Sequence, residues 1–474
     1  MPRIVIGGGG ISGLVVAYRL EQHLPGAEVV VLEQQPQLGG KIGTIERAGF
    51  RVEMGPNGFL DNKPAMLNLC RDIGLADNLV PASAVSSRNR FLFLRGRMRA
   101  LPTGPWSFLT SDVLSPGGKL RMLLERVRPR RREITDESIY AFALRRVGRE
   151  VADTLADAFV SGIFAGDPKR LSVRACFPRL VKFESEQGSV MAGFAAARVQ
   201  RRAEAAAKGE VLPQRGQAMW SFRAGLGLLI DTLRSRLRRP PVVGVTIRSL
   251  RRRADANDWQ VRAAGGDLWT ADAVVLTCPA HQQAELLADV DPQLATELAG
   301  IAYTPVAVVA LGYRAIDVPG RLDGFGYLTP QRDRRDVLGV QWCSSIYPDR
   351  APEGMVLLRA LCGGWNRADV LTWDDDRLLA AVRAELSVTM RIYAPPRFHQ
   401  VVRWERAIPQ YHVGHLGRVE RIEERTRAHP GLFLGGNSFR GVALNDCVEQ
   451  AEALAASLDC ARPREMAGRL FTQA

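Results

Sequence analysis

The sequence predicts a multidomain α/β fold. Residues 4–33 show the pattern of a strand, a glycine turn, a helix over residues 11–23 and a second strand that ends at Glu33. The chain has 474 residues, which is too many for a single hydrophobic core, so we expect two or three domains. Apolar strands near residues 273–279 and 431–436 indicate that the chain returns to the domain of residues 4–33 after leaving it. These observations predict an α/β (α+β multidomain) architecture around a Rossmann-like domain.

The turn after the first strand has the spacing that suits a dinucleotide pyrophosphate. Gly8 allows the tight turn, Gly10 lets the backbone approach the phosphates, and Gly13 lets the helix pack on the strand. The helix N-terminus directs free N–H groups and its positive dipole end at the anion. Glu33 follows Gly13 by 20 residues, where a carboxylate can accept hydrogen bonds from a ribose hydroxyl. The flanking strands and the acid disfavour the competing interpretation, an ordinary glycine-rich turn.

Composition excludes several classes of protein. Hydrophobic residues make up 46% and charged residues 24%, values at which large disordered regions are not expected. The chain has no run of about 18 apolar residues and no cleavage-site pattern, so we expect a cytoplasmic chain without a transmembrane helix or signal peptide. Its seven cysteines are scattered without a CxxC pair, and His412 with His415 lacks a neighbouring acid or thiol ligand. Neither a disulfide framework nor a metal site is predicted.

The net charge of +14 bears on the partners of the chain. The arginines are spread along the sequence without a helix-turn-helix or zinc pattern, so nucleic acid is not an expected partner. Anionic lipid headgroups or a polycarboxylate substrate explain the charge equally well, and a coding bias toward arginine is a third explanation.

Patterns further along the chain predict its organisation. We expect a hairpin at 88–104, helices over 106–210 with an exposed helix at 195–209 before a mobile loop at 209–216, a helix at 226–237, a strand at 242–247, a hairpin at 259–270, alternating strands with a helix (374–390) over 300–400, and a closing helix at 445–458. These patterns predict a discontinuous nucleotide domain (1–87, 216–290 and 401–474), a substrate domain (88–105 and 291–400) and a helical domain (106–215).

The segment 117–132 mixes leucines with many arginines. This composition is typical of a segment that lies on a membrane surface, and it is equally typical of a solvated basic face on a core-packed helix. A helical, membrane-facing domain is the first of two open interpretations. It would place the protein peripherally on the inner face of the cell membrane.

The run from Gly435 to Cys447 is the most specific stretch of the chain. Together with the N-terminal turn, it resembles the flavin-dependent amine oxidase superfamily and, within it, the oxygen-dependent protoporphyrinogen oxidase family. The resemblance runs nearly end to end and includes residues 89–92, 101–104, 162–167, 171–172, 324–326, 408–411 and 414–415.

The resemblance implies a non-covalent FAD cofactor and its contacts. Gly8, Gly9, Gly10, Ile11, Ser12 and Gly13 would hold the pyrophosphate, Glu33 the adenosine ribose, and Lys41 the phosphate or ribityl chain. Gly55, Pro56, Asn57 and Gly58 would lie beside the isoalloxazine ring, Val245 in mid-strand would contact the adenine edge, and Asn437, Val442, Ala443 and Leu444 would contact the ribityl and pyrimidine end. The dipole of the helix at 445–458 would then stabilise negative charge on the reduced flavin.

The resemblance also implies substrate contacts. Arg90 matches an arginine that faces a propionate, and a guanidinium offers a bidentate, permanently charged grip on a carboxylate. Phe325 and the stretch with Ile163, Phe164 and Gly166 resemble walls of a porphyrinogen cavity. A solvated arginine and a core phenylalanine are the competing interpretations.

The implied reaction oxidises protoporphyrinogen IX to protoporphyrin IX in haem biosynthesis. Six electrons would leave in three hydride transfers to flavin N5, and molecular oxygen would reoxidise the flavin to give hydrogen peroxide. The sequence offers no Ser/His/Asp set and no carboxylate pair as a catalytic base, so we assign no catalytic side chain. The oligomeric state stays open, with a homodimer among the options.

Three alternatives remain. A coproporphyrinogen III oxidase that forms coproporphyrin III would share nearly every motif. An amine oxidase would place a Tyr or Trp near the flavin, and residues 440–444 contain neither. A binding protein similar to the GDP-dissociation inhibitors would share the fold without flavin, so the flavin absorbance separates it from an enzyme.

Overall fold

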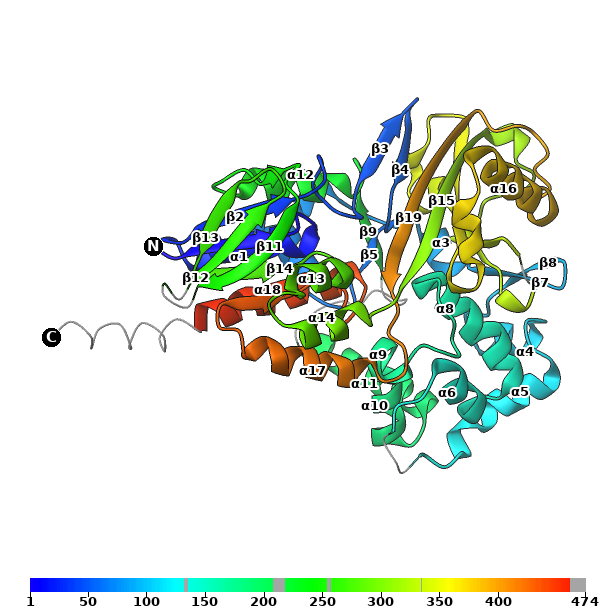
Figure 1. Ribbon diagram of the computed structural model, residues 1–474. Coiled ribbons are helices and arrows are strands. Elements are labelled where there is room, and N and C mark those ends of the chain that lie inside the picture. The colour runs from blue at the N-terminus through cyan, green and yellow to red at the C-terminus, as the bar shows by residue number, and fades with distance from the viewer. Residues whose placement is uncertain (132–134, 208–217, 254–255, 257, 334, 461–474) are drawn as a thin grey trace.

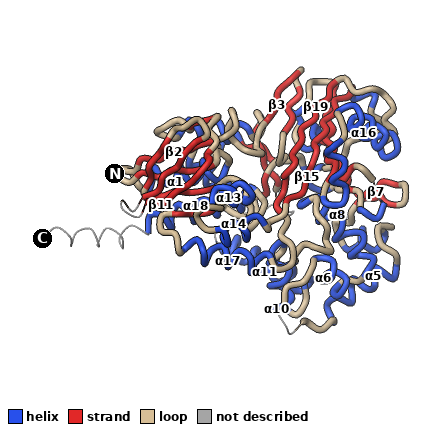
Figure 2. The backbone as a smooth tube through the Cα atoms, in the orientation of Figure 1, coloured by secondary structure: helices blue, strands red, loops and turns tan. Residues whose placement is uncertain are grey.

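The computed structural model describes residues 1–131, 135–207, 218–253, 256, 258–333 and 335–460. The described chain forms three parts (Figure 1): one around a parallel sheet, one around a seven-stranded sheet, and a helical part that lies below the seven-stranded sheet in this view. Figure 2 shows strands concentrated in the first two parts and helices in the third.

Five parallel strands form the centre of the first part. They are paired in the order β10-β2-β1-β14-β20, with bounds β1 (Arg3–Gly7), β2 (Glu28–Glu33), β10 (Val242–Val243), β14 (Ala273–Leu276) and β20 (Leu432–Leu434). Parallel sheets are covered on both faces, which explains their continuous apolar runs. In β1, Ile4 and Ile6 enter one hydrophobic core and Val5 enters the other. The predicted strand–turn–helix–strand unit and the Rossmann-like class are confirmed.

Each face of this sheet has its own cover. The core that contains Ile4 is closed by α1 (Ile11–His23), α2 (Ala65–Asp72), α12 (Gly227–Arg236) and α18 (Leu444–Cys460). The core that contains Val5 is closed by an antiparallel sheet and three helices: β11 (Ile247–Arg253), β12 (Asp258–Ala263), β13 (Leu268–Ala271), α13 (Ala280–Leu287), α14 (Pro292–Ala299) and α17 (His415–Arg427). Two small sheets lie beside them: β3 (Thr44–Arg47) with β4 (Phe50–Glu53), and β5 (Phe59–Leu60) with β9 (Met219–Phe222) and β6 (Leu79–Pro81).

The prediction of one strand over residues 242–247 is wrong. The chain leaves the parallel sheet after Val243 and begins β11 in a different sheet at Ile247. Gly244 has φ +73° between them, a backbone conformation that glycine adopts without a Cβ clash. The apolar run hides this break because both flanking pieces are strands.

The seven-stranded sheet has the order β19-β15-β18-β17-β16-β7-β8. Its strands are β7 (Phe91–Leu94), β8 (Arg97–Ala100), β15 (Tyr303–Arg314), β16 (Gly326–Leu328), β17 (Val337–Trp342), β18 (Met355–Gly363) and β19 (Phe398–Pro409). The predicted hairpin is confirmed: Arg95 and Gly96, with φ +52° and +73°, form the two-residue turn between β7 and β8. One face packs on α16 (Asp375–Thr389) through a shared core.

The predicted boundary at 400/401 falls within β19, and the boundary at 290/291 separates α14 from α13, with which it packs. β19 pairs with β15 as far as Pro409, so the seven-stranded sheet continues past residue 400. α14 packs with α13 and α17 in the core of the parallel sheet, although it follows residue 291. Long-range strand pairing places residues 401–409 in the seven-stranded sheet, and long-range helix packing places α14 beside the parallel sheet. Local sequence patterns carry neither signal.

The helical part contains α4 (Pro105–Thr110), α5 (Pro116–Leu123), the 3-10 helix η2 (Leu124–Val127), α6 (Ile139–Arg146), α7 (Arg149–Val151), α8 (Asp157–Phe164), α9 (Val173–Cys176), α10 (Pro178–Gln187) and α11 (Val190–Ala207). Helices therefore occupy the predicted range as far as the structure describes it. The loop predicted at 209–216 lies outside the described residues.

Candidate functional site

The glycine turn of residues 7–13 lies at the carboxyl end of β1, against the N-terminus of α1. Gly8 has φ +115°, and a Cβ on Gly13 would stand 2.0 Å from the Gly8 carbonyl oxygen. A Cβ on Gly10, which caps α1 without a side chain, would meet nothing within 4 Å. The packing glycine and the glycine beside open space thus stand where the motif predicts, and the first amides of α1 are left for an anion.

Glu33 closes the turn from the neighbouring strand. Its buried carboxylate accepts hydrogen bonds from the Gly9 N–H at 2.7 Å and the Gln35 N–H at 2.8 Å. These contacts hold the acid beside the glycine turn, where a ribose hydroxyl would approach.

Lys41 enters the site on a second glycine turn. The Gly39 N–H donates to the Gly9 carbonyl at 2.9 Å, which brings residues 39–41 beside the first turn. Nζ of Lys41 lies 5.6 Å from the centroid of the Tyr303 ring, and desolvation lowers the pKa of this lysine to about 8. Within the described residues no carboxylate pairs with it. An amine desolvated in this way is ready for an anionic group of a ligand.

The loop of residues 55–58 packs directly against Lys41. A Cβ on Gly55 would stand 2.1 Å from the Lys41 carbonyl oxygen, and one on Gly58 would stand 2.6 Å from the Trp220 carbonyl oxygen. Asn57 is buried, and neither its amide nitrogen nor its amide oxygen has a hydrogen-bond partner among the described residues. Close packing therefore requires both glycines. The side-chain amide of Asn57 remains able to form hydrogen bonds with a ligand.

The C-terminal run joins the same site from β20 and α18. Gly436 has φ +104°, and α18 begins at Leu444, so Asn437, Val442 and Ala443 lie between that strand and this helix. α1 packs against α18 in one hydrophobic core, which includes Ile11 at the start of α1 and Leu444 and Cys447 in the first turn of α18. The N-termini of the two helices therefore meet, and the two predicted motifs form one site.

Val245 differs from its prediction. It lies between β10 and β11 rather than in mid-strand, and its N–H donates to the Glu33 carbonyl at 2.9 Å.

Arg90 and Phe325, two predicted substrate contacts that are far apart in the sequence, lie next to each other in the structure. The Arg90 guanidinium stands 5.2 Å from the centroid of the Phe325 ring, and the Phe325 N–H donates to the Asn89 carbonyl at 2.8 Å. Partial desolvation lowers the pKa of Arg90, and within the described part of the chain no carboxylate pairs with it. A Cβ on Gly324 would stand 2.8 Å from the Asn89 carbonyl, and Gly326 has φ +130°. The two glycines explain how Phe325 reaches the arginine.

The stretch of residues 163–166 is divided between surface and core. Ile163 is exposed, but Phe164 is buried and packs against Phe177 and Tyr411. A Cβ on Gly166 would stand 2.3 Å from the Gln410 side chain, so this glycine serves internal packing. In the structure the Phe164 ring belongs to the core of the helical part and does not form an open wall.

Tyr303 is a residue that the sequence analysis missed. Its hydroxyl accepts a hydrogen bond from the Ala280 N–H at 3.0 Å and lies 2.6 Å from the Ser438 hydroxyl. A tyrosine at the start of a strand carries no motif, and only the fold brings it to the C-terminal run.

Comparisons with known proteins agree with this site. Residues 11–458 match the family described as flavin containing amine oxidoreductase. Coproporphyrinogen III oxidase of Bacillus subtilis is 31% identical, with 95% of this chain and 96% of that protein covered. Chloroplastic protoporphyrinogen oxidase 1 of Arabidopsis thaliana is 34% identical, with 94% and 86% covered. A crystal structure from Exiguobacterium sp. 255-15, assigned as a protoporphyrinogen oxidase, superposes with a TM-score of 0.84 at 26% identity and covers 97% and 99% of the two chains.

The residues present fit the predicted cofactor. Open space at Gly10, the first amides of α1, the desolvated amine of Lys41 and the carboxylate of Glu33 suit a pyrophosphate and a ribose. The match over nearly the whole chain agrees with that chemistry. The chain belongs to the flavin containing amine oxidoreductase family and is an FAD-dependent oxidoreductase.

Proposed function

We propose that this protein oxidises a porphyrinogen to a porphyrin, with protoporphyrinogen IX as the substrate and molecular oxygen as the electron acceptor. The observation that carries the proposal is the partly desolvated Arg90 guanidinium, without a carboxylate partner in the described chain, against the ring of Phe325. A flat macrocycle with carboxylate side chains needs an aromatic plane and a cation side by side. Relatives named as protoporphyrinogen oxidases, from Arabidopsis thaliana and from Homo sapiens, support the same substrate class.

The division of labour follows from the site. Bound FAD supplies the two-electron acceptor, and three such oxidations convert a porphyrinogen to a porphyrin. Arg90 binds a propionate and orients the macrocycle, while Phe325 covers one of its faces. Lys41 and the first amides of α1 hold the negatively charged pyrophosphate in the middle of the cofactor, and no side chain is assigned as a base.

Coproporphyrinogen III is the second candidate substrate. The specific observation in its favour is the Bacillus subtilis relative of that name, which matches 95% of this chain. Arg90 does not separate the two substrates, because both carry propionates.

A paired substrate assay tests the proposal. The purified protein should show a flavin absorption spectrum and should form porphyrin from protoporphyrinogen IX, with three hydrogen peroxide molecules for each porphyrin. Coproporphyrinogen III, putrescine and an anaerobic sample run in parallel. A lower kcat/KM for protoporphyrinogen IX than for coproporphyrinogen III would favour the second candidate, and oxidation of neither porphyrinogen would refute the proposal. If the purified protein contained no flavin, the result would favour the alternative of a non-enzymatic binding protein.

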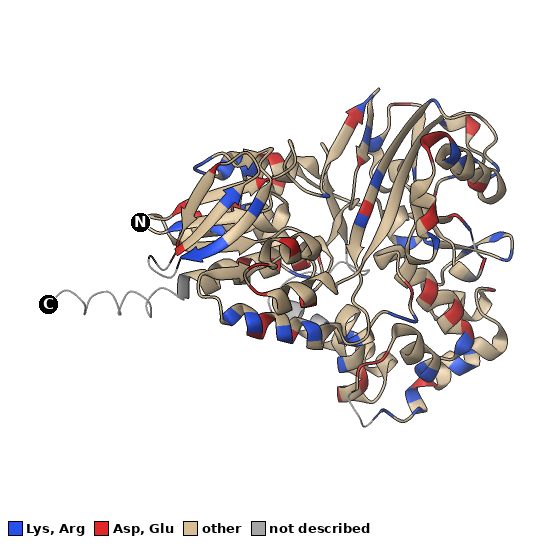
Figure 3. Ribbon diagram, in the orientation of Figure 1, with Lys and Arg blue, Asp and Glu red and all other residues tan. Residues whose placement is uncertain are grey.

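We also propose that the helical part contacts an anionic membrane surface peripherally. Large apolar side chains are exposed on α4, α5 and η2, which we call the α4–η2 surface: Trp106, Leu109, Leu120, Leu123, Leu124 and Val127. Exposed Arg126 and Arg128 lie beside them in sequence, and Figure 3 shows further basic residues on the helices of this part. An apolar surface with flanking cations suits acyl chains below acidic headgroups. In the described chain, no helix is long and apolar enough to span a bilayer.

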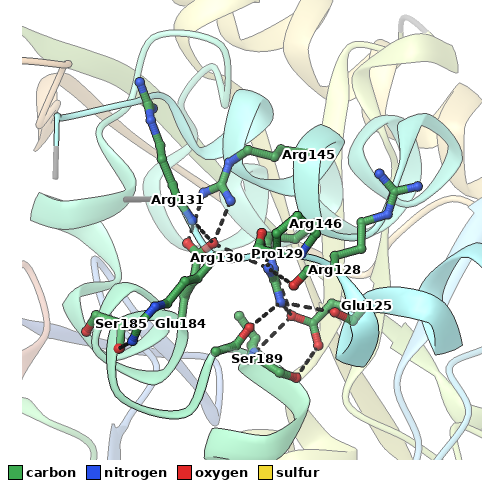
Figure 4. Close-up of polar contacts among 12 residues, drawn as sticks. Glu125, Arg128, Pro129, Arg130, Arg131, Arg145, Arg146, Glu184, Ser185 and Ser189 are labelled. Atoms are coloured by element: carbon green, nitrogen blue, oxygen red, sulfur yellow. Dashed lines mark hydrogen bonds and ion pairs between the residues drawn. The ribbon is translucent and has the colours of Figure 1, made fainter. Parts of the chain in front are cut away.

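A buried ion-pair network anchors this surface (Figure 4). Arg146 and Glu125, both almost fully buried, form an ion pair with an Nε–Oε1 distance of 2.8 Å. Arg146 also donates to the carbonyl oxygens of Arg128 and Pro129. Glu125 accepts from the Ser189 hydroxyl at 2.6 Å and from the first amides of α11. Burial opposes ionisation of Glu125, but the hydrogen bonds from Ser189 and Arg146 lower its pKa. The network holds the exposed segment on a rigid base, which favours a docking surface.

A further inference from the structure

Residues 410–415 connect three parts of the chain, and the proposed function gives them no role. They follow β19 and lead into α17. The Gln410 N–H donates to the Ala302 carbonyl beside the seven-stranded sheet at 2.8 Å, and the Ser172 N–H of the helical part donates to the Tyr411 carbonyl at 2.8 Å. The Tyr411 hydroxyl donates to the Asn437 carbonyl at 2.5 Å. The segment therefore reaches the C-terminal run from the two other parts.

Two side chains of this segment bind alternate carbonyls of the C-terminal run. Tyr411 binds the Asn437 carbonyl, and His415 Nε2 lies 2.9 Å from the Phe439 carbonyl. Both side chains are buried, with 1% and 4% of their surface exposed, and their rings stack at 4.1 Å with an interplanar angle of 14°. Tyr303 contacts Ser438 between them. Three consecutive residues of the run are thus each held by a side chain from elsewhere.

Burial lowers the pKa of His415 to about 4, which keeps the imidazole neutral near pH 7. A neutral imidazole carries one N–H, and at Nε2 that N–H faces the Phe439 carbonyl, an acceptor. The contact is therefore a hydrogen bond donated by His415.

The C-terminal run needs such support. Its residues 435–443 lie between β20 and α18, outside any strand or helix, and they include Gly435, Gly436 and Gly441. Glycines increase the backbone freedom that must be lost when the run is ordered. Because Asn437 and residues 442–444 are its predicted cofactor contacts, their geometry depends on what holds residues 437–439.

We propose that Tyr411 and His415 are positioning residues for FAD, which fix the carbonyls of Asn437 and Phe439 so that the run meets the cofactor in one conformation. The inference rests on the assignment of residues 437–444 to the FAD site, and it is independent of the substrate. Neither side chain needs to touch the cofactor. Their effect passes through the backbone of the C-terminal run.

Two conservative variants test the inference. Tyr411→Phe removes the hydroxyl but keeps the ring that stacks on His415. His415→Phe keeps a stacked ring but removes the N–H donor. Tyr313→Phe is the matched control, because Tyr313 is equally buried and lies in the core between the seven-stranded sheet and α16.

The first readout is the dissociation constant of FAD for the apoprotein, measured by flavin fluorescence. It should rise about five- to tenfold in Tyr411→Phe and in His415→Phe, because a run that has lost one anchor must be ordered when FAD binds, and stay within about twofold in Tyr313→Phe. The double variant should lose less than the product of the single effects, because both residues hold the same run. The visible circular dichroism of the bound flavin should also change in the two variants and not in the control.

The second readout separates positioning from general stability. The Tm of each apoprotein and holoprotein is measured, and the stabilisation by FAD should shrink in Tyr411→Phe and His415→Phe while their apoprotein Tm stays close to that of Tyr313→Phe. An unchanged FAD dissociation constant with equal losses of Tm in apoprotein and holoprotein would overturn the inference. Since FAD binding is measured without substrate, a protein that oxidises no porphyrinogen would refute the proposed function alone.

Discussion

The guanidinium of Arg90 lies 5.2 Å from the centroid of the Phe325 ring. The two residues come from different segments, and the parallel pairing of β7 with β16 brings their strands together. A cation over an aromatic face places a positive charge beside an apolar surface, the pair of features that the proposed substrate requires.

Arg90→Ala should lower kcat/KM for either porphyrinogen about 10- to 100-fold, mainly through KM, because a charge-assisted hydrogen bond to a carboxylate is lost. Arg90→Lys should recover part of the loss, since it keeps the charge without the bidentate geometry. Steady-state kinetics measure both. Exposed Arg88, two positions earlier, provides the control Arg88→Ala. Equal kcat/KM values for Arg90→Ala and Arg88→Ala would contradict the assignment of Arg90 to the substrate site.

Gly13→Ala should weaken the fold and the FAD site together, because the new Cβ would stand 2.0 Å from the Gly8 carbonyl oxygen. Relief of that clash must move α1 away from β1, at a cost of about 1–3 kcal/mol in the free energy of unfolding. Chemical denaturation and the FAD content of the purified protein measure the effect. Gly26→Ala is the control, since a Cβ there meets nothing within 4 Å. Similar losses in the two variants would contradict the packing role of Gly13.

FAD affinity should fall as the pH rises above about 8. Desolvation lowers the pKa of Lys41 to about 8 in the FAD-free protein, and a bound pyrophosphate would raise it again, so binding takes up a proton above that pH. The lowered pKa of Lys41 has the opposite effect on the folding stability of the apoprotein, which rises with pH instead of falling. Between pH 8 and the ordinary lysine value of 10.5, the unfolded chain holds more protons than the folded one, so stability gains from rising pH.

Titrations of FAD binding between pH 7 and 9.5 measure the dependence of affinity on pH. Lys41→Met should bind FAD more weakly at pH 7 and should lack most of the decline. A decline of equal size in Lys41→Met would assign the proton uptake to another group.

The double variant Trp106→Ser/Val127→Ser should bind anionic vesicles about tenfold more weakly than the parent protein. Both side chains are about three-quarters exposed, at 77% and 76%, and their apolar contact with the bilayer would be lost. Cosedimentation with vesicles of phosphatidylglycerol and phosphatidylcholine measures binding, with high salt as a test of the charge contribution. Ile316→Ser provides the control, because Ile316 is 84% exposed outside the helical part. Parent protein that does not sediment with these vesicles would refute the membrane proposal.

Much of the parallel-sheet part was predictable because its signals are local. The spacing of Gly8, Gly10 and Gly13 after an apolar strand encodes a tight turn and a close helix contact within a few residues. The turn at Arg95 and Gly96 is local in the same way, since the hairpin needs positive φ at two adjacent positions. Such features depend on neighbours in the chain, and the sequence lists those neighbours directly.

Contacts between segments that are distant in the sequence could not be predicted from local patterns. The stretch with Phe164 and Gly166 matched a cavity wall, yet Phe164 packs in a core and Gly166 makes room for Gln410. Val245 lost its predicted strand because Gly244 turns the chain and Glu33 accepts its N–H. Side-chain burial and hydrogen-bond partners are set by whichever element packs nearby, and periodicity does not name that element.

The sequence by itself determined that this chain builds a dinucleotide turn, a second glycine run near its C-terminus and an arginine suited to a carboxylate. Only the tertiary structure decided that the N-termini of α1 and α18 pack together in one core, and that Tyr411 and His415 hold the run between β20 and α18. The physical reason is that glycine spacing constrains a few adjacent dihedral angles, whereas a site assembled from distant segments exists only once sheet pairing and core packing bring them together.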